Sequence, residues 1–398
     1  MGRKMRIFIV PVNDLMRHPI PTRMYHIAKR LAEKHDVYLL SYTKHPLASR
    51  IIRRLNIAEI PVNKAVSTNS VGLYYFINVP QLYISIKRTI ERENIDTIIH
   101  ANILPSFIAS KLAKKLKIPN IYDFQDYFPE SASAYYVKGK HFIELGVKTF
   151  VYSALKNSVA IVTPSYGLKT IVHEIVPDKS VHVIPNGVDS ELFKPMDQEI
   201  ARKSIGLDKD YYLLLLQGSL DAWLDMENVM RILSKLRKSV DVRLLIVGFS
   251  HAKHYYRLLL TYAKHYEIDK YVYMYPPQPY EKIPLFINSS DVVLAPYKRM
   301  MKNFTTPLKV AEALACGKPV ITTSNAEFKL WYHKGVYFYN NYEELERVLS
   351  HVVNNYEDIQ GELKGYSDYF RKEFSWDNIS NKFENVVVAA NANKHARE

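Results

Sequence analysis

The chain has 398 residues, of which 47% are hydrophobic, and a formal net charge of +14 at pH 7. This length exceeds one ordinary domain and predicts two, each able to bury its own core. A single cysteine, Cys316, excludes an internal disulfide and a cysteine metal cluster, which fits a reducing compartment. No apolar stretch approaches the ~18 residues needed to span a bilayer, so we expect a protein that is soluble or attached to a membrane from one side.

The positive charge is unevenly distributed. Residues 1–190 hold 26 Lys and Arg against 14 Asp and Glu, and the remainder is close to balanced. This asymmetry predicts an acidic partner for the first half, either a membrane leaflet or a nucleic acid.

The first half alternates apolar strands with helices of 3.6-residue periodicity, which predicts a parallel α/β sheet. The loop after the first strand contains no glycine, so a glycine-rich dinucleotide fingerprint is absent. The expected strands are 5–10, 36–40, 97–100, 120–124, 159–162 and 181–184, and the expected helices are 21–34, 81–94, 105–116, 142–155 and 165–175.

Residues 47–55 have the pattern of a basic amphipathic helix. One side would be apolar and the other would carry Arg50, Arg53 and Arg54. Such a helix can lie on an anionic membrane, where each arginine contributes about 1 kcal/mol. The alternative is a helix packed on its own domain with a solvated basic face.

Acidic side chains follow the strand expected at 120–124. In parallel sheets, ligands collect at the carboxyl ends of strands, which makes Asp123, Asp126 and Glu130 candidates for a site. Asp126 is a candidate to bind or deprotonate a ligand hydroxyl; the alternative is a helix cap. His100 ends the preceding strand and is a further candidate, although a lone histidine there is more often a structural residue than a catalyst.

A turn cluster at 185–189 marks the junction to a second β/α series. Gly218 and Ser219 follow the first strand of that series and form a candidate phosphate-facing loop. The expected strands are 211–217, 242–247, 271–275, 291–295, 320–322 and 336–338, and the expected helices are 225–237, 251–266, 281–288, 307–315 and 343–353.

The helix expected at 307–315 has the features of an anion site. Thr306 is a suitable N-cap and Pro307 a suitable first residue, so free amides and the positive end of the helix dipole would point outward. Lys309 adds a charge in the first turn. Glu312, one turn deeper on the same face, could accept two hydrogen bonds from a vicinal diol. Phosphates beside a ribose describe a nucleotide; the alternative is a surface helix with an i, i+3 ion pair.

Two motifs resemble the family-4 retaining glycosyltransferases of the GT-B fold. They are the junction Val-Ile-Pro-Asn-Gly-Val-Asp-Ser-Glu-Leu-Phe-Lys-Pro (183–195) and Pro-Leu-Lys-Val-Ala-Glu-Ala-Leu-Ala-Cys-Gly-Lys-Pro-Val (307–320). Residues 123–130 and 218–225 are further similar to a branch with Asp-x-x-Asp-x-x-Pro-Glu and Trp-x-Asp motifs, often found in surface-polysaccharide and lipid-linked glycan assembly.

The resemblance implies an α/β architecture of two Rossmann-like domains that face each other across a cleft. Residues 1–185 would form the acceptor-binding domain and residues 186–373 the nucleotide-sugar-binding domain. Residues 374–398 would form a helix that returns to the first domain.

Carried over by position, the resemblance implies that Glu312 binds the ribose hydroxyls and Lys309 the diphosphate. Phe304 stands where the family has the first glutamate of its paired motif, so the contact to the donor sugar must come from elsewhere. The other implied donor-binding positions are Gly218, Ser219, Thr305, Thr306, Pro307 and Leu308.

The expected activity is transfer of a sugar from a UDP- or GDP-linked donor to an acceptor hydroxyl, with Lys309 and Asp126 as catalytic residues and no metal or other cofactor. The basic first half, with His100, Asp123, Arg50, Arg53 and Arg54 on its acceptor and membrane side, suggests a lipid-linked acceptor and a cytoplasmic protein at the inner face of the cell membrane. The alternatives are a transferase with a soluble acceptor and a non-catalytic nucleotide-sugar sensor. A nucleic-acid-binding protein is less consistent, because no recognised module for it is present.

Overall fold

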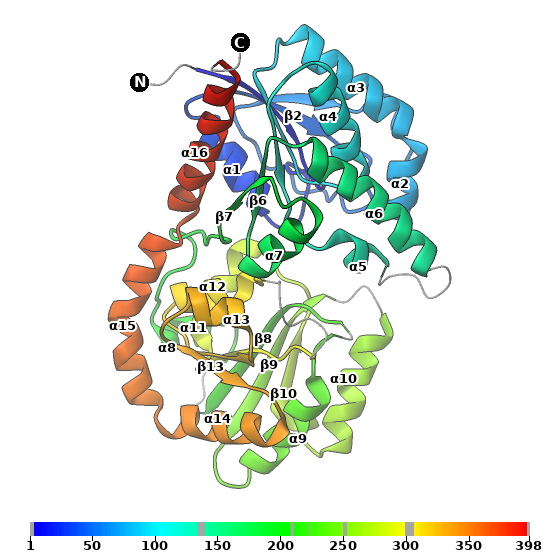
Figure 1. Cartoon of the computed structure of the whole chain (residues 1–398). Coiled ribbons are helices and arrows are strands. Elements are labelled where there is room, and N and C mark those ends of the chain that lie inside the picture. Colours follow the sequence, from blue (N-terminus) through cyan, green and yellow to red (C-terminus); the bar gives the residue numbers. More distant parts are fainter. Residues whose placement is uncertain are drawn as a thin grey trace. The chain divides into compact units, whose positions relative to one another are not determined.

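The structure is a computed structural model that describes residues 4–133, 140–207, 211–221, 223–249, 253–298 and 306–395. The chain forms two compact units. Unit 1 comprises Met1–Asn186 and Trp376–Glu398, and unit 2 comprises Gly187–Ser375. The chain therefore passes between the units twice, as the colours of Figure 1 show.

Unit 1 contains a parallel sheet of seven described strands in the order β3-β2-β1-β4-β5-β6-β7. The order reverses beside β1, which is the topology of a doubly wound Rossmann-like sheet. The strands are β1 (Arg6–Val10), β2 (Asp36–Ser41), β3 (Ala58–Pro61), β4 (Thr97–His100), β5 (Asn120–Asp123), β6 (Ala160–Thr163) and β7 (Ser180–Val183).

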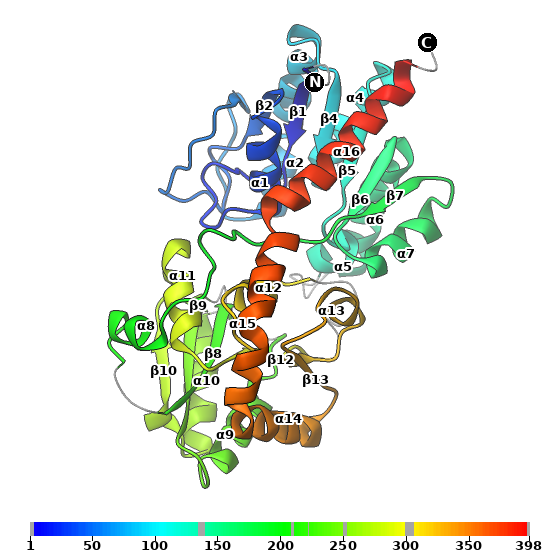
Figure 2. The same cartoon turned by 90° about the vertical axis from the view of Figure 1, so that its left-hand side faces the viewer.

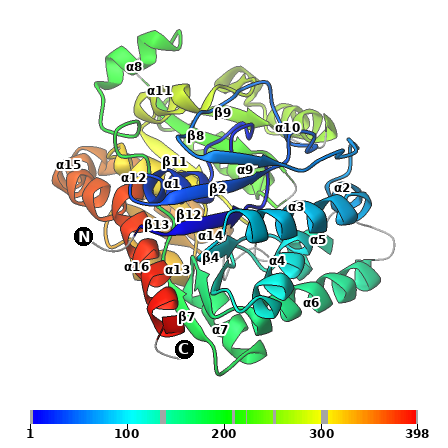
Figure 3. The same cartoon turned by 90° about the horizontal axis from the view of Figure 1, so that it is seen from above.

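Helices cover both faces of this sheet, so its central strands are buried and mostly apolar. The helices of unit 1 are α1 (Arg23–Leu31), α2 (Val71–Ile77), α3 (Val79–Arg92), α4 (Leu104–Lys115), α5 (Phe128–Ser133), α6 (Lys140–Asn157), α7 (Tyr166–Ile175) and α16 (Trp376–His395). Figures 1 and 3 show α3 and α4 on one face and α1 and α16 on the other.

Unit 2 repeats the plan with a parallel sheet of six described strands in the order β10-β9-β8-β11-β12-β13. The predicted pair of Rossmann-like sheets is thus confirmed. The strands are β8 (Tyr212–Ser219), β9 (Val242–Phe249), β10 (Val272–Tyr275), β11 (Val292–Ala295), β12 (Val320–Thr323) and β13 (Val336–Tyr339).

The core of unit 2 is built from the leucine-rich β8 and its neighbours, packed against helices with one apolar stripe. The helices are α8 (Gln198–Ser204), α9 (Met226–Leu236), α10 (Lys253–His265), α11 (Ile283–Ser289), α12 (Leu308–Ala315), α13 (Ala326–Trp331), α14 (Tyr342–Asn354) and α15 (Tyr356–Glu373), with short 3-10 turns η1 (Asp269–Tyr271) and η2 (Tyr280–Lys282).

The last helix, α16, packs against α1, the first helix of the chain, as Figure 2 shows. The prediction that the C-terminal helix returns to the first domain is therefore confirmed. The ring of His26 stacks on Trp376 with the centroids 4.7 Å apart, and Arg23 Nη1 donates to the carbonyl of Pro185 at 2.8 Å. Helix α1 therefore contacts both the segment where the chain leaves unit 1, at Pro185, and the segment where it returns, at Trp376.

Candidate functional site

The candidate donor site lies at the carboxyl edge of the sheet of unit 2, where the strand order reverses. There β8 and β11 are neighbours, and the chain continues from β11 towards α12. Open parallel sheets bind their ligands at this point, because the loops on its two sides diverge. The sheet topology therefore places the end of β8 and the start of α12 at the edge where a ligand is expected.

Gly218 and Ser219 were predicted as a loop after the strand, but they are the last two residues of β8, and the backbone at this end of the strand depends on two glycines. Gly218 has φ +99°, a conformation that residues with a side chain rarely adopt. Its register partner on β9 is Gly248, and a Cβ atom at Gly248 would lie 1.9 Å from the carbonyl oxygen of Gly218. The shape of the backbone therefore requires that both positions lack a side chain. Ser219 Oγ donates to Asp221 Oδ2 at 2.6 Å, which fixes the end of the strand further.

The side chain of Lys309 reaches this end of β8. A Cβ atom built on Gly218 would lie 3.6 Å from Lys309 Cε and 3.7 Å from Nζ, and Nζ lies 5.6 Å from the centre of the Tyr297 ring. The lysine makes no ion pair with any described residue, and burial lowers its pKa to about 8, although Glu312 opposes that shift. A poorly hydrated cation beside a glycine is a suitable partner for a phosphate group.

Glu312 lies one turn deeper on α12, and two side chains hold its carboxylate. Gln217 Nε2 donates to Oε2, and the Tyr280 hydroxyl donates to Oε1, both at 3.1 Å. Burial raises the pKa of Glu312 to about 7, against the opposing effects of these two hydrogen bonds and of Lys309. Each oxygen can accept a further hydrogen bond, so the group is oriented to receive a diol.

The start of α12 differs from the prediction by one residue. The helix begins at Leu308, and Pro307, with φ −59° and ψ 131°, is its N-cap in place of Thr306. The extended ψ keeps Pro307 outside the helix, and its ring offers no group to cap the amides. The amides of Leu308 and Lys309 are therefore the first of the helix. Thr305, also predicted to bind the donor, lies outside the described residues.

Two of the residues predicted at the acceptor side are enclosed in unit 1. His100 is buried in the sheet, its ring centroid lies 4.8 Å from that of Tyr122, and burial lowers its pKa to about 3. Asp123 is also fully buried, and Arg23 Nε donates to both its carboxylate oxygens at 3.2 Å. Both side chains therefore belong to the interior and not to an acceptor surface.

Asp126 has a different environment. It is half-buried in the loop between β5 and α5, beyond the carboxyl end of the strand, and its backbone carbonyl accepts from the amide of Phe128 at 2.9 Å. Among the acidic residues that follow β5, Asp126 thus combines the strand-end position with access to solvent.

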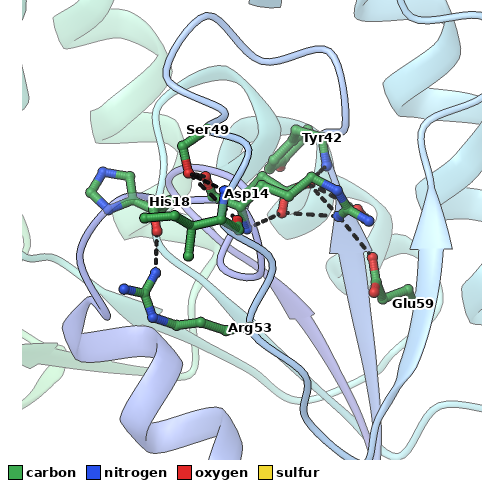
Figure 4. Close-up of polar contacts among 9 residues, drawn as sticks. Asp14, His18, Tyr42, Ser49, Arg53 and Glu59 are labelled. Atoms are coloured by element: carbon green, nitrogen blue, oxygen red, sulfur yellow. Dashed lines mark hydrogen bonds and ion pairs between the residues drawn. The ribbon is translucent and has the colours of Figure 1, made fainter. Parts of the chain in front are cut away.

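The helix predicted at 47–55 is not formed, and the segment is a loop. Arg53 donates to the backbone carbonyls of His18 and Pro19, and the amide of Ser49 donates to the carbonyl of Arg17 at 2.7 Å (Figure 4). These contacts satisfy the backbone of the loop between β1 and α1 and hold 47–55 in a non-helical path. Arg53 is therefore a structural residue, whereas Arg50 and Arg54 are exposed.

Arg17 joins the same loop to the edge of the sheet. Its Nη1 lies 3.2 Å from Asp14 Oδ1 and 3.0 Å from Glu59 Oε2, and Asp14 Oδ2 accepts from the amide of Tyr42 at 2.9 Å (Figure 4). The network fixes the first βα loop without glycine, which is how unit 1 replaces the glycine-rich loop that its sequence lacks.

Three residues of the donor site were not predicted from the sequence: Gln217, Tyr280 and Tyr297. Only Gln217 carries a signal in the sequence, because it is a polar residue at the end of the apolar run Leu213–Leu216. In the structure its side chain is 3% exposed. A buried amide in that position requires a polar partner, which the structure identifies as Glu312.

Comparisons with known proteins identify the family and the fold of the chain. Residues 197–358 match the family model described as glycosyl transferases group 1, and residues 20–192 match the model described as glycosyltransferase family 4. A lipopolysaccharide 1,2-N-acetylglucosaminetransferase of Salmonella typhimurium is 25% identical over 240 residues, which cover 57% of this chain and 61% of that enzyme. An N-acetyl-alpha-D-glucosaminyl L-malate synthase of Bacillus anthracis is 21% identical over 308 residues, covering 75% and 73%.

Other curated relatives match over a shorter part, such as a D-inositol 3-phosphate glycosyltransferase of Catenulispora acidiphila, 28% identical over 36% of this chain and 35% of that enzyme. The chain thus spans less than two thirds of the first relatives it matches. Among solved structures, a sucrose-phosphate synthase of Thermosynechococcus elongatus aligns over 98% of this chain and 100% of its own, with a TM-score of 0.81 at 14% identity. The Anabaena protein HepE in complex with UDP-glucose aligns over 97% and 100%, with a TM-score of 0.70 at 14% identity. These likenesses confirm the predicted GT-B fold.

Proposed function

This chain belongs to the group-1, family-4 glycosyltransferases, and from this premise we propose that it transfers a sugar from a nucleotide diphosphate sugar to an acceptor hydroxyl with retention at the anomeric carbon. The observation that carries the proposal is the pair formed by Lys309 and the clamped Glu312 beside Gly218. A cation for a diphosphate and a carboxylate for a ribose stand one helical turn apart, which matches the order of groups in a nucleotide.

In this mechanism the bond between the anomeric carbon and the diphosphate oxygen breaks while the acceptor oxygen bonds to the same face of the sugar. Negative charge accumulates on the leaving diphosphate. Lys309 and the first amides of α12 are already oriented towards the region where that charge develops, so they stabilise the transition state without reorganisation. They supply the positive charge that a metal ion would otherwise provide.

We assign the acceptor hydroxyl to Asp126, which can orient it and hold its proton as the new bond forms. The half-buried position of this carboxylate beyond β5 supports the assignment. His100 and Asp123 are enclosed and take no part in it.

The acceptor class that we favour is lipid-linked, presented at the inner face of the cell membrane. The excess of basic residues in the first half and the similarity to a lipopolysaccharide glycosyltransferase support this choice. No described helix is both long and apolar enough to cross a bilayer. A soluble acceptor is the second candidate, because the malate synthase relative matches over the larger share of the chain.

Incubation of the purified protein with a panel of UDP- and GDP-linked sugars tests the proposal. We expect slow donor hydrolysis without acceptor, transfer in its presence, an anomeric configuration in the product that equals that of the donor, and activity that survives EDTA. Binding of a nucleotide without hydrolysis or transfer would instead indicate a sensor. A strict requirement for a divalent cation would contradict the role given to Lys309 and α12.

The pH dependence of kcat/KM for the donor should be a narrow bell with limbs near the pKa values of about 7 for Glu312 and about 8 for Lys309. Activity rises as Glu312 loses its proton and can accept the diol, and it falls as Lys309 loses its charge. Tyr280→Phe removes a hydrogen bond that favours the carboxylate, so the acid limb should move to higher pH. Lys309→Arg should move the alkaline limb out of range. A flat profile between pH 6 and 9 would refute both assignments.

A further inference from the structure

The solvent face of the helix pair α2 and α3 is apolar. Phe76 is 74% exposed, and Leu73, Ile77, Tyr83 and Ile84 are each 40% or more exposed. We call this group, with the preceding valines, the α2–α3 surface. Its members are Val66, Val71, Leu73, Phe76, Ile77, Tyr83 and Ile84. Figures 1 and 3 show the two helices on the outside of unit 1.

The fold of unit 1 does not need these side chains. The opposite face of the same helices is also apolar, and Tyr74, Leu82 and Ile86 are buried there in the core. A surface helix normally presents one apolar stripe to the core and polar residues to water. A second apolar stripe on the solvent side, at spacings of three and four residues, indicates a surface that binds a partner outside the folded unit.

The excess of basic residues around this surface indicates an acidic partner. Residues 60–90 contain no Asp or Glu, whereas Lys64, Lys87 and Arg88 are exposed in the same stretch. Among the described residues, Lys87 forms an ion pair with Glu91 at 3.7 Å, and both side chains are solvent-exposed. Between residues 37 and 90 the one acidic residue is Glu59, and Arg17 neutralises it.

The loop at 47–54 repeats the composition, with Leu47, Ile51 and Ile52 exposed beside Arg50 and Arg54. Exposed aliphatic and aromatic side chains next to basic ones fit the boundary between lipid headgroups and acyl chains. A water-soluble protein partner would be expected to place acidic residues against the basic ones, and it would not require apolar exposure in two separate segments.

The geometry points to the α2–α3 surface as the site at which unit 1 docks on an anionic lipid bilayer. Phe76 and its neighbours insert into the interface, while Lys64, Lys87 and Arg88 contact acidic headgroups. The inference deepens the proposed function and rests on it in one respect, since docking serves a lipid-linked acceptor. The surface belongs to the unit to which that acceptor is assigned.

Vesicle flotation of the full chain tests the docking site directly, without donor or acceptor. The wild-type protein should float with vesicles of phosphatidylcholine and phosphatidylglycerol but not with phosphatidylcholine alone, and added salt should weaken binding. Phe76→Asp should lower the partition coefficient at least tenfold, because it removes the most exposed side chain of the α2–α3 surface and adds a repelled charge. The matched control is Ile200→Asp in unit 2, which is 60% exposed and should bind like the wild type.

Charge reversal provides a second, independent variant. Lys64→Glu with Arg88→Glu should weaken binding at least about 25-fold, since each basic residue near an anionic surface contributes roughly fivefold. Equal flotation of the wild type and Phe76→Asp would overturn the inference, as would equal loss in Ile200→Asp. A wild-type dimer that Phe76→Asp dissociates, with lipid binding unchanged, would assign the surface to a second copy of the chain instead.

The same variants separate this inference from the proposed function. Nucleotide binding, measured as a thermal shift with UDP or GDP, uses unit 2 and should be equal in all of them. A chain that floats with anionic vesicles but neither binds nor hydrolyses a sugar nucleotide would refute the transferase proposal and leave the docking site standing. A chain that transfers sugar but shows no preference for anionic vesicles would do the opposite.

Discussion

Replacing Lys309 by alanine is expected to lower kcat for sugar transfer by about two to three orders of magnitude, the usual effect of removing one preorganised group that stabilises a developing anion. Its Nζ lies beside Gly218 and forms no ion pair with a described residue, and Glu312, one turn deeper on α12, is the carboxylate that acts on its charge. The loss should appear mainly in kcat, because the charge on the diphosphate grows during departure of the leaving group.

Protein stability separates this effect from misfolding. Burial lowers the pKa of Lys309 to about 8, so the protonated lysine is less stable in the folded chain than in the unfolded chain. Below pH 8 the side chain therefore disfavours folding, and Lys309→Ala should melt at the same or a higher temperature. Lys270→Ala, an exposed lysine of the same unit, is the control and should retain full activity. Unchanged kcat in Lys309→Ala would exclude the lysine from the mechanism.

Replacing Arg23 by alanine should lower the free energy of unfolding of unit 1 by about 3–5 kcal/mol, because it leaves a buried carboxylate without its cation. Asp123 is fully buried and pairs with Arg23 Nε, and Arg23 Nη1 also donates to the carbonyl of Pro185. Chemical denaturation monitored by circular dichroism measures the effect.

The sign of the pH dependence follows from the pKa of Asp123. Burial raises this pKa, and Arg23 opposes the rise. Without Arg23 the pKa rises further, so the penalty in Arg23→Ala is greatest at neutral pH and shrinks as acid protonates the carboxyl. Adding Asp123→Leu should restore much of the stability. Lys29→Ala, which changes an exposed residue of the same helix, is the control and should cost no more than about 1 kcal/mol. An equal loss in both single variants would contradict the buried-pair account.

The sequence predicted those elements whose signals are local. The apolar run of β8 and the Pro307 signal of α12 are both local, and both elements formed within a residue or two of the expected bounds. By contrast, β3 is short and mostly exposed, and α2 has exposed apolar residues that mimic a buried strand, so neither was predicted.

The failures at the candidate site have a different cause, because they depend on partners that are distant in the sequence. In the sequence, Arg53 is equivalent to Arg50 and Arg54, and only the fold brings the carbonyls of His18 and Pro19 to it. Likewise, the sequence position of Asp123 is typical of a site carboxylate, but in the fold Arg23, 100 residues earlier, donates a hydrogen bond to it. The local periodicity of the sequence does not predict either pairing.

Gly248 gives the site an indirect kind of constraint. It belongs to the neighbouring strand and offers no side chain to a nucleotide, yet the carbonyl of Gly218 occupies the space that a methyl group at Gly248 would need. Any larger residue there would displace the backbone at Gly218, so a screen of random variants should recover Gly248 among the intolerant positions. At this edge of the sheet, positions can therefore be intolerant of substitution because of the backbone conformation, and not only because they contact a ligand.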